Sequence, residues 1–154
     1  MNNIRPITFA EVRGRRALDR AGKSDKGAVL ISIRPEYVRR IFSGKKRYEF
    51  RKKDCGRGVT EFFVYETAPR SAVIGKFRSL VRLSGSPEFV WELTKDFAGI
   101  GKDEFFRYFE GCETAWAFRI EGAERFRRPR PLSDFGVSWP PQNFQYVDFP
   151  EVSK

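Results

Sequence analysis

From residue 28 onward, the chain consists of short apolar or alternating runs separated by glycine, proline and charged residues. Runs rich in β-branched and aromatic residues, or alternating between apolar and polar positions, are typical of strands. They predict strands at residues 28–33, 46–52, 59–65, 72–83, 114–120 and 144–147. Apolar residues spaced three or four apart predict short helices at residues 35–42, 87–97 and 102–110.

The order of these elements indicates one domain of the α+β class that is mainly β. Strands follow one another with helices only as inserts, without the strand–helix alternation of a parallel α/β sheet. The pattern favours a small barrel or open sheet of about five to six strands. The chain is 40% hydrophobic, which is enough to form a core. Its 154 residues are too few for two domains of usual size.

Some side chains have a predicted place within these elements. Alternation along residues 114–120 directs Trp116 toward the core, whereas Trp91 lies off the apolar stripe of its helix. We therefore expect Trp91 to be a lid or contact residue. A second basic run is expected to form a solvated loop or to contact phosphate. It comprises Arg125, Arg127, Arg128 and Arg130.

Positive charge is concentrated in the first third of the chain. The whole chain has a net charge of +10, whereas residues 1–57 alone carry 17 basic and 6 acidic residues, a net +11. Residues 1–26 are rich in arginine and lysine and poor in large apolar residues, which predicts a flexible basic arm before a domain at residues 27–154. The asymmetry favours nucleic acid as partner over an anionic membrane surface, with a merely basic soluble protein as the alternative.

Composition also excludes several classes of protein. No apolar run approaches the roughly 18 residues of a membrane span, and the polar N-terminus lacks the apolar centre of a secretory signal, so we expect no membrane association. Two cysteines, Cys55 and Cys112, are typical of a cytoplasmic protein without disulfides and cannot form a four-cysteine zinc site. The chain has no histidine, which excludes imidazole bases and ligands. No metal or cofactor is predicted.

Residues 44–51 concentrate the candidate chemistry. Glu49 and Arg51 are two residues apart in a predicted strand, so they share a face and are placed to form an ion pair. Lys46, at the mouth of this strand, is then free to contact a phosphate or carbonyl group of a ligand. If Lys46 is buried beside Arg47 and Arg51, its pKa falls and it can act as a base or nucleophile. The alternative, which spacing alone favours, is an ordinary surface charge cluster.

The pattern Gly44-x-Lys46-x-x-Glu49-x-Arg51 resembles the G-x-K-x-x-E-x-R signature of the ASCH domain, a family with a PUA-like β-barrel. Flanking segments are also similar to ASCH members, namely Arg34-Pro35-Glu36-Tyr37, Tyr65-Glu66-Thr67-Ala68-Pro69, Ile74-Gly75-Lys76-Phe77 and Trp139-Pro140-Pro141-Gln142-Asn143-Phe144. The resemblance covers about residues 28–147. It implies a barrel with short helices packed over a cleft whose floor is lined by the signature residues.

For function, the resemblance implies RNA binding by analogy with PUA domains, and some members are described as ribonucleases. Some small bacterial members are amidohydrolases that deacetylate N4-acetylcytidine. In these, the signature lysine works with a threonine three residues later and with a glutamate of the helical insert. Here Lys46 matches the lysine, but Glu49 stands at the threonine position. The nearest candidate for the helical glutamate is Glu92.

Three functions remain open at this point. The first is a domain that binds or processes RNA or another single-stranded nucleic acid, with Lys46 and Glu49 as catalytic residues if it is an enzyme. Its ligand contacts are predicted to be Arg51, Gly44, Arg34, Tyr65, Ser71, Trp139, Gln142 and Asn143. Trp139 has the alternative role of sealing the barrel, and Tyr65 and Ser71 that of plain turn residues. The second function is a metal-free amidohydrolase acting on a modified nucleoside, and the third is a regulatory domain whose arm binds protein or DNA.

Overall fold

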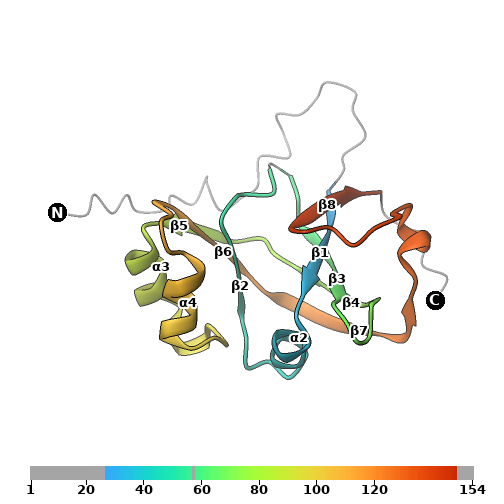
Figure 1. Cartoon of the computed structure of the whole chain (residues 1–154), viewed down its shortest axis with the longest axis horizontal. Helices are drawn as coiled ribbons and strands as arrows, with labels where there is room; N and C mark the ends of the chain where they lie inside the picture. The colour runs from blue at the N-terminus through green and yellow to red at the C-terminus, as the bar shows by residue number, and fades with distance from the viewer. Residues whose placement is uncertain (1–26, 57, 149–154) are drawn as a thin grey trace.

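The computed structural model describes residues 27–56 and 58–148, so the predicted arm at residues 1–26 lies outside the described residues. Within them, eight strands form two sheets, accompanied by three α-helices and two short 3-10 helices (Figure 1). The architecture is therefore α+β and mainly β, as the sequence predicts.

The larger sheet has five strands in the order β7-β4-β3-β1-β8. β1 and β3 run parallel, with Ile31 opposite Val64, and the other neighbours are antiparallel. The strands are β1 (Ala28–Ile33), β3 (Glu61–Glu66), β4 (Ala72–Arg78), β7 (Glu121–Arg130) and β8 (Phe144–Val147). β1 and β3 are nearly continuous apolar runs because both of their faces are covered.

The smaller sheet has three antiparallel strands in the order β2-β6-β5. The strands are β2 (Tyr48–Arg51), β5 (Arg82–Gly85) and β6 (Ala115–Arg119). β2 is an edge strand of this sheet, with Phe50 opposite Ala117 of β6. The second half of the signature therefore lies on a strand that has a sheet partner on one side.

Three α-helices connect the strands, namely α2 (Pro35–Phe42), α3 (Pro87–Thr94) and α4 (Lys102–Tyr108). Proline occupies the first turn of α2 and α3, where its missing N–H costs no hydrogen bond. Ser86 Oγ accepts a hydrogen bond from the Phe89 N–H (3.2 Å) and so caps α3. Figure 1 shows α3 and α4 together beside the smaller sheet, and α2 below β1. The two 3-10 helices are η1 (Lys95–Phe97) and η2 (Leu132–Phe135).

Buried side chains form three apolar clusters. One cluster joins the face of β1 that carries Ile31 to α2 and to Phe118 of β6. A second covers the opposite face of the larger sheet, where η2 contributes Phe135. The third packs Phe105 and Phe109 of the α4 region against the smaller sheet. None of the helices in the described part of the chain is long and apolar enough to cross a membrane.

The sheets do not close into the predicted barrel, and the strand count exceeds the predicted five to six. The predicted strand at residues 72–83 is divided at Ser79 into β4 of the larger sheet and β5 of the smaller one. The Ser79 N–H donates to the Thr60 carbonyl (2.9 Å), and Ser79 Oγ donates to the Val81 carbonyl (3.1 Å). These bonds turn the chain from one sheet into the other, so the strands form two sheets.

Two further predictions are wrong in detail. The basic run expected to be a loop forms the second half of β7, where it pairs with β4. Trp91 is 9% exposed, and its ring packs against that of Phe105 (centroids 5.0 Å apart). It is therefore a core residue of the helical insert, which consists of α3, η1 and α4. Trp116 packs against the core cluster of Phe118, as predicted, although it is only partly buried.

Candidate functional site

The signature begins at the end of α2 and continues into β2. Gly44 has a φ of +83° and is exposed, and its N–H donates to the Ile41 carbonyl (3.1 Å) in the turn that ends the helix. The Lys46 N–H then donates to the Arg40 carbonyl (2.9 Å). Gly44, predicted as a ligand contact, thus has a clear backbone role that turns Lys46 inward.

Lys46 is buried, with 3% of its surface exposed. Its ammonium group donates a hydrogen bond to the Ala98 carbonyl (2.8 Å) and lies over the rings of Phe50 (4.7 Å) and Tyr37 (5.3 Å). A lysine ammonium has three donors, so a single carbonyl leaves capacity for a ligand. The alternative of an exposed charge cluster is therefore wrong for this residue.

Burial lowers the pKa of Lys46 to about 8, because the charged form loses its hydration. The charge of Glu49 opposes this effect, whereas Arg51 and Arg40 lower the pKa further. Lys46 is then partly neutral at mildly alkaline pH and is able to accept a proton. Arg47, which the sequence analysis expected to contribute, instead extends over the exposed ring of Phe97 (4.4 Å).

Glu49 and Arg51 form the predicted ion pair, and both are buried. Arg51 Nε (3.2 Å) and Nη2 (3.0 Å) both approach Glu49 Oε1, so the pair is not the two-oxygen fork typical of arginine and carboxylate. Arg51 Nη2 also donates to the Ser32 carbonyl of β1 (2.7 Å), and Nη1 donates to Asn143 Oδ1 (3.0 Å). Arg51 thereby links β2, β1 and the segment before β8.

A second carboxylate near Lys46 comes from α4 and was missed by the sequence analysis. Glu104 lies beside Tyr37, and the pKa of Tyr37 is raised to about 12, first by burial and then by its interaction with the Glu104 carboxylate. Glu104 also raises the pKa of Lys46 through its charge. Glu92, the sequence-based candidate, is exposed and pairs with Lys95 (2.8 Å). The sequence does offer one indication of Glu104: it directly precedes Phe105, which lies on the apolar face of a predicted short helix.

The segment after η1 closes over the Lys46 side chain. The Arg47 N–H donates to the Phe97 carbonyl (2.9 Å), and Arg40 Nη1 donates to the Gly99 carbonyl (2.8 Å). Gly99 has a φ of +64°, and a Cβ built on it would lie 2.3 Å from Lys46 Cβ. Glycine is therefore required here both by the backbone conformation and by the close approach of the lysine.

The other predicted ligand residues are spread over the fold. Tyr65 is 5% exposed in the apolar cluster of Phe63, and Ser71 lies exposed at the turn before β4 with a φ of +52°. Arg34 is exposed at the start of α2, and Gln142 is exposed beside Asn143. Trp139 is 81% exposed, which contradicts the alternative that it seals the fold.

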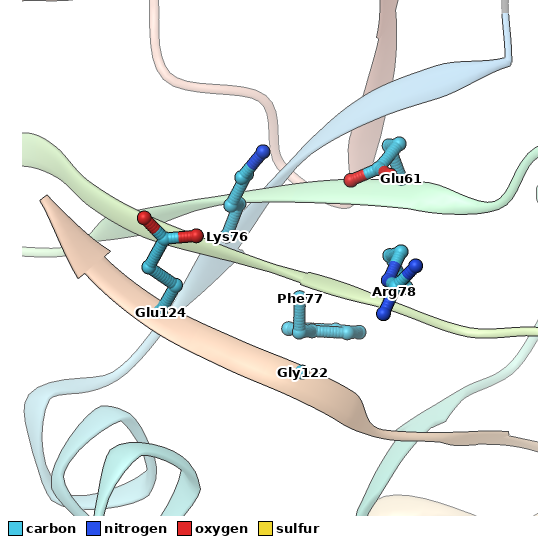
Figure 2. A pocket seen from close by; sticks show the side chains of 6 residues that line it. All are labelled: Glu61, Lys76, Phe77, Arg78, Gly122 and Glu124. Carbon is cyan, nitrogen blue, oxygen red and sulfur yellow. The ribbon is translucent and has the colours of Figure 1, made fainter. Parts of the chain in front are cut away.

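A separate pocket lies on the larger sheet and contains no signature residue. Figure 2 shows Lys76 of β4 beside Glu124 of β7, with Arg78 farther along β4 and Glu61 on the neighbouring strand β3. Two cations and two carboxylates balance one another, so the pocket does not select an anion. In the described ranges of the chain, no group of three or more cysteine, aspartate or glutamate side chains is arranged to hold a metal ion.

Comparisons with known proteins agree with this picture, although no family model matches the chain. A curated protein named ASCH domain-containing ribonuclease, from Zymomonas mobilis, is 28% identical over 134 residues, which are 84% of this chain and 90% of that protein. The crystal structure of ASCH from Zymomonas mobilis has a TM-score of 0.74 at 27% identity, covering 81% of this chain and 90% of that one. A serine-to-alanine variant of that protein has a TM-score of 0.75, covering 84% and 94%.

Two curated proteins from strains of Ureaplasma parvum serovar 3 are also similar. Both are named large ribosomal subunit protein uL22 and are 28% identical over 120 residues, 77% of this chain. The chain spans 39% of their length.

A buried lysine beside a glutamate–arginine pair, at the junction of two sheets and a helical insert, defines a small α+β protein of the PUA-like class. Within that class, the chain is similar to proteins of the ASCH domain family.

Proposed function

We propose that this protein binds RNA and cleaves it with Lys46 as the general base. The observation that carries the proposal is a buried lysine with a pKa of about 8, held between a Glu49–Arg51 pair and a Tyr37–Glu104 pair. Such a lysine combines a proton acceptor with nearby positive charge, which is what phosphodiester cleavage needs. The similarity to a protein named as a ribonuclease, and the net charge of +10, support RNA as the substrate.

In the proposed step, neutral Lys46 takes the proton of a ribose 2′-hydroxyl. The 2′-oxygen forms a bond to the adjacent phosphorus, and the bond from phosphorus to the 5′-oxygen breaks. The products are a 2′,3′-cyclic phosphate and a 5′-hydroxyl end, the leaving oxygen taking a proton from solvent. Once protonated, Lys46 itself supplies donors for the charge that develops on the phosphate oxygens, and the nearby Arg51 guanidinium adds positive charge.

Other residues are proposed to contact the RNA rather than to react. Asn143 is fixed by Arg51, and Gln142 and Trp139 are exposed on the same segment, where an amide and an indole suit base edges and base faces. Arg34 is exposed at the start of α2 near Tyr37 and suits a phosphate. Tyr65 and Ser71 have no such place in this proposal.

The test compares Lys46→Ala, Lys46→Arg and the matched control Lys45→Ala on a fluorescent RNA oligonucleotide. We expect both Lys46 variants to lose cleavage, because arginine cannot lose its proton at working pH, and the exposed Lys45 to be dispensable. The wild-type rate should rise with pH and level off above about 8. A 2′-deoxy substitution at the cleaved position should block the reaction. Cleavage retained by Lys46→Arg would show that Lys46 is a phosphate contact.

A second candidate function is favoured by Glu104 alone. The resemblance to nucleoside amidohydrolases implies a helical glutamate beside the lysine, and Glu104 supplies a carboxylate near Lys46 from α4. Glu49 at the threonine position argues against this activity. Turnover of N4-acetylcytidine should be absent from the wild type and should appear, if at all, in Glu49→Thr. Turnover by the wild type would favour the amidohydrolase.

A further inference from the structure

Two basic segments that are far apart in the sequence come together on one surface. α2 ends with Arg39 and Arg40, and β7 carries the run that starts at Arg125. The two elements are in contact, and Arg125 lies over the ring of Phe42 (4.8 Å). Figure 1 shows α2 near β7, which is an edge strand of the larger sheet.

The exposed cations of this surface are arginines without a carboxylate at ion-pair distance in the described part of the chain. They are Arg39, Arg40, Arg125 and Arg127. We call this set the arginine surface. By contrast, the exposed cations Lys95 and Arg119 elsewhere have carboxylate neighbours, Glu92 (2.8 Å) and Glu121 (3.8 Å). Unneutralised guanidinium groups that gather on one face favour an anionic partner.

The arginine surface leads directly to Lys46. Arg40 lies over the Tyr37 ring (5.5 Å) and donates to the Gly99 carbonyl, which adjoins the Ala98 carbonyl that binds Lys46 Nζ. A chain of contacts thus runs from β7 through α2 to the candidate site. A polymer bound at Lys46 would have its next phosphates over this surface.

The chemistry of the surface distinguishes among anionic partners. Guanidinium groups bind phosphate oxygens in a planar, two-donor geometry. A surface that binds a membrane strongly combines cations with apolar side chains that enter the lipid interface. The large exposed apolar residues of the described chain lie on other elements, and they are Leu80, Leu93, Phe97, Tyr108, Trp139 and Tyr146. The surface therefore suits a phosphate backbone better than a lipid interface.

We infer that α2 and β7 form a phosphate-binding track that holds the RNA backbone beside Lys46. This inference rests on the proposed function, since it takes RNA as the polymer. It extends that function by assigning affinity to residues that take no part in the chemistry. The track contacts phosphates and not bases, so its effect should be independent of base sequence.

The experiment measures RNA affinity of the full chain against salt concentration. The track variant is Arg39→Gln/Arg125→Gln/Arg127→Gln, and the control with the same net charge is Lys95→Gln/Lys102→Gln/Arg119→Gln, whose residues are all exposed outside the surface. The slope of log affinity against log salt should become shallower by about 2 in the track variant, since each lost phosphate contact contributes about 0.7 for a single strand. The control should keep the wild-type slope. The RNA concentration at half-maximal rate should rise, and the rate at saturating RNA should stay within about twofold of the wild type.

The variant Arg39→Lys/Arg125→Lys/Arg127→Lys keeps the positive charges but changes the packing of the side chains. It should keep the wild-type slope of log affinity against log salt. The inference is overturned, with the proposed function intact, if wild-type RNA cleavage depends on Lys46 but the track and control variants show equal slopes. It is also overturned if the track variant loses binding to phosphatidylserine vesicles while its RNA affinity is unchanged. Failure of the wild type to bind RNA at low salt would instead overturn the proposed function, and this inference with it.

Discussion

At the scale of single residues, Lys46 holds an ionisable group where water is nearly absent. Its pKa of about 8 lies below the ordinary 10.5, so the folded state binds the proton less tightly than the unfolded chain does. The charged lysine therefore costs stability at neutral pH, by about 1.4 kcal/mol for each unit of lowered pKa. Retaining such a group is typical of a functional position.

This cost predicts that Lys46→Met is more stable than the wild type. Below pH 8 the whole penalty is present, and we expect a gain of up to about 3 kcal/mol, reduced by the lost bond to the Ala98 carbonyl. Between pH 8 and 10.5 the unfolded state binds more protons than the folded state, so wild-type stability rises with pH and the gain shrinks. Denaturant unfolding at several pH values measures it. An equal difference at pH 7 and pH 10 would contradict a buried charge.

The Tyr37–Glu104 pair offers a second test at this scale. Glu104→Gln removes the negative charge that helps to keep the Tyr37 hydroxyl protonated. We expect the pKa of Tyr37 to fall from about 12 but to stay above 10, because burial is the larger cause. Ultraviolet titration of the phenolate, with Tyr37→Phe as the reference that identifies the signal, measures the shift. An unchanged titration would show that Glu104 does not contact Tyr37 in solution.

At the scale of elements, the site depends on how the helical insert packs against the segment that leads into β2. The insert contributes Glu104 and also the 97–99 carbonyls that bind Lys46, Arg40 and the Arg47 N–H. Its own core of Trp91 and Phe105 holds α3 and α4 against the smaller sheet. The insert is therefore part of the site rather than a separate cover.

Two glycines of this region make a matched pair for measuring that dependence. Gly99 and Gly44 both have positive φ, but a Cβ on Gly99 would meet Lys46 Cβ at 2.3 Å, whereas a Cβ on Gly44 would meet nothing within 4 Å. Gly44→Ala should cost about 1 to 2 kcal/mol of unfolding free energy from backbone strain alone. Gly99→Ala should cost more and should also displace Lys46 and reduce RNA cleavage. Equal losses of stability in the two variants would show that the close approach does not exist in solution.

At the scale of the whole molecule, Arg51 connects the two sheets. It lies on β2 of the smaller sheet, donates to the Ser32 carbonyl of β1 in the larger sheet and binds Asn143 before β8. The site thus lies where the sheets meet, and its geometry depends on how one sheet is docked on the other. Breaking this link should affect stability and function together.

Arg51→Met should therefore be strongly destabilising, by about 3 to 5 kcal/mol, because it leaves Glu49 buried without its partner. The double variant Glu49→Gln/Arg51→Met removes both charges and should recover part of this loss. Thermal and denaturant unfolding of the single and double variants measure the coupling between the two residues. If the losses simply add, the two charges are energetically independent and the ion pair contributes nothing to stability.

The sequence by itself predicted the mainly β α+β class, most strands and helices, the Glu49–Arg51 pair and the ASCH resemblance. These features are local, because period-two and period-3.6 patterns, proline at Pro35 and Pro87, and two-residue spacing on a strand are encoded by near neighbours. The same local signals could not show that the strand at residues 72–83 turns between two sheets at Ser79. That break depends on a bond to Thr60, a residue of another segment.

Only the tertiary structure decided which carboxylate lies near Lys46 and how deeply the lysine is buried. Glu92 and Glu104 occupy similar short helices, and their difference lies in how α3 and α4 are oriented on the smaller sheet. The arginine surface likewise exists because β7 passes beside α2, more than eighty residues away in the chain. How deeply a side chain is buried and which charges lie near it depend on contacts between segments that are far apart in the chain. Those contacts are fixed only when the elements pack together.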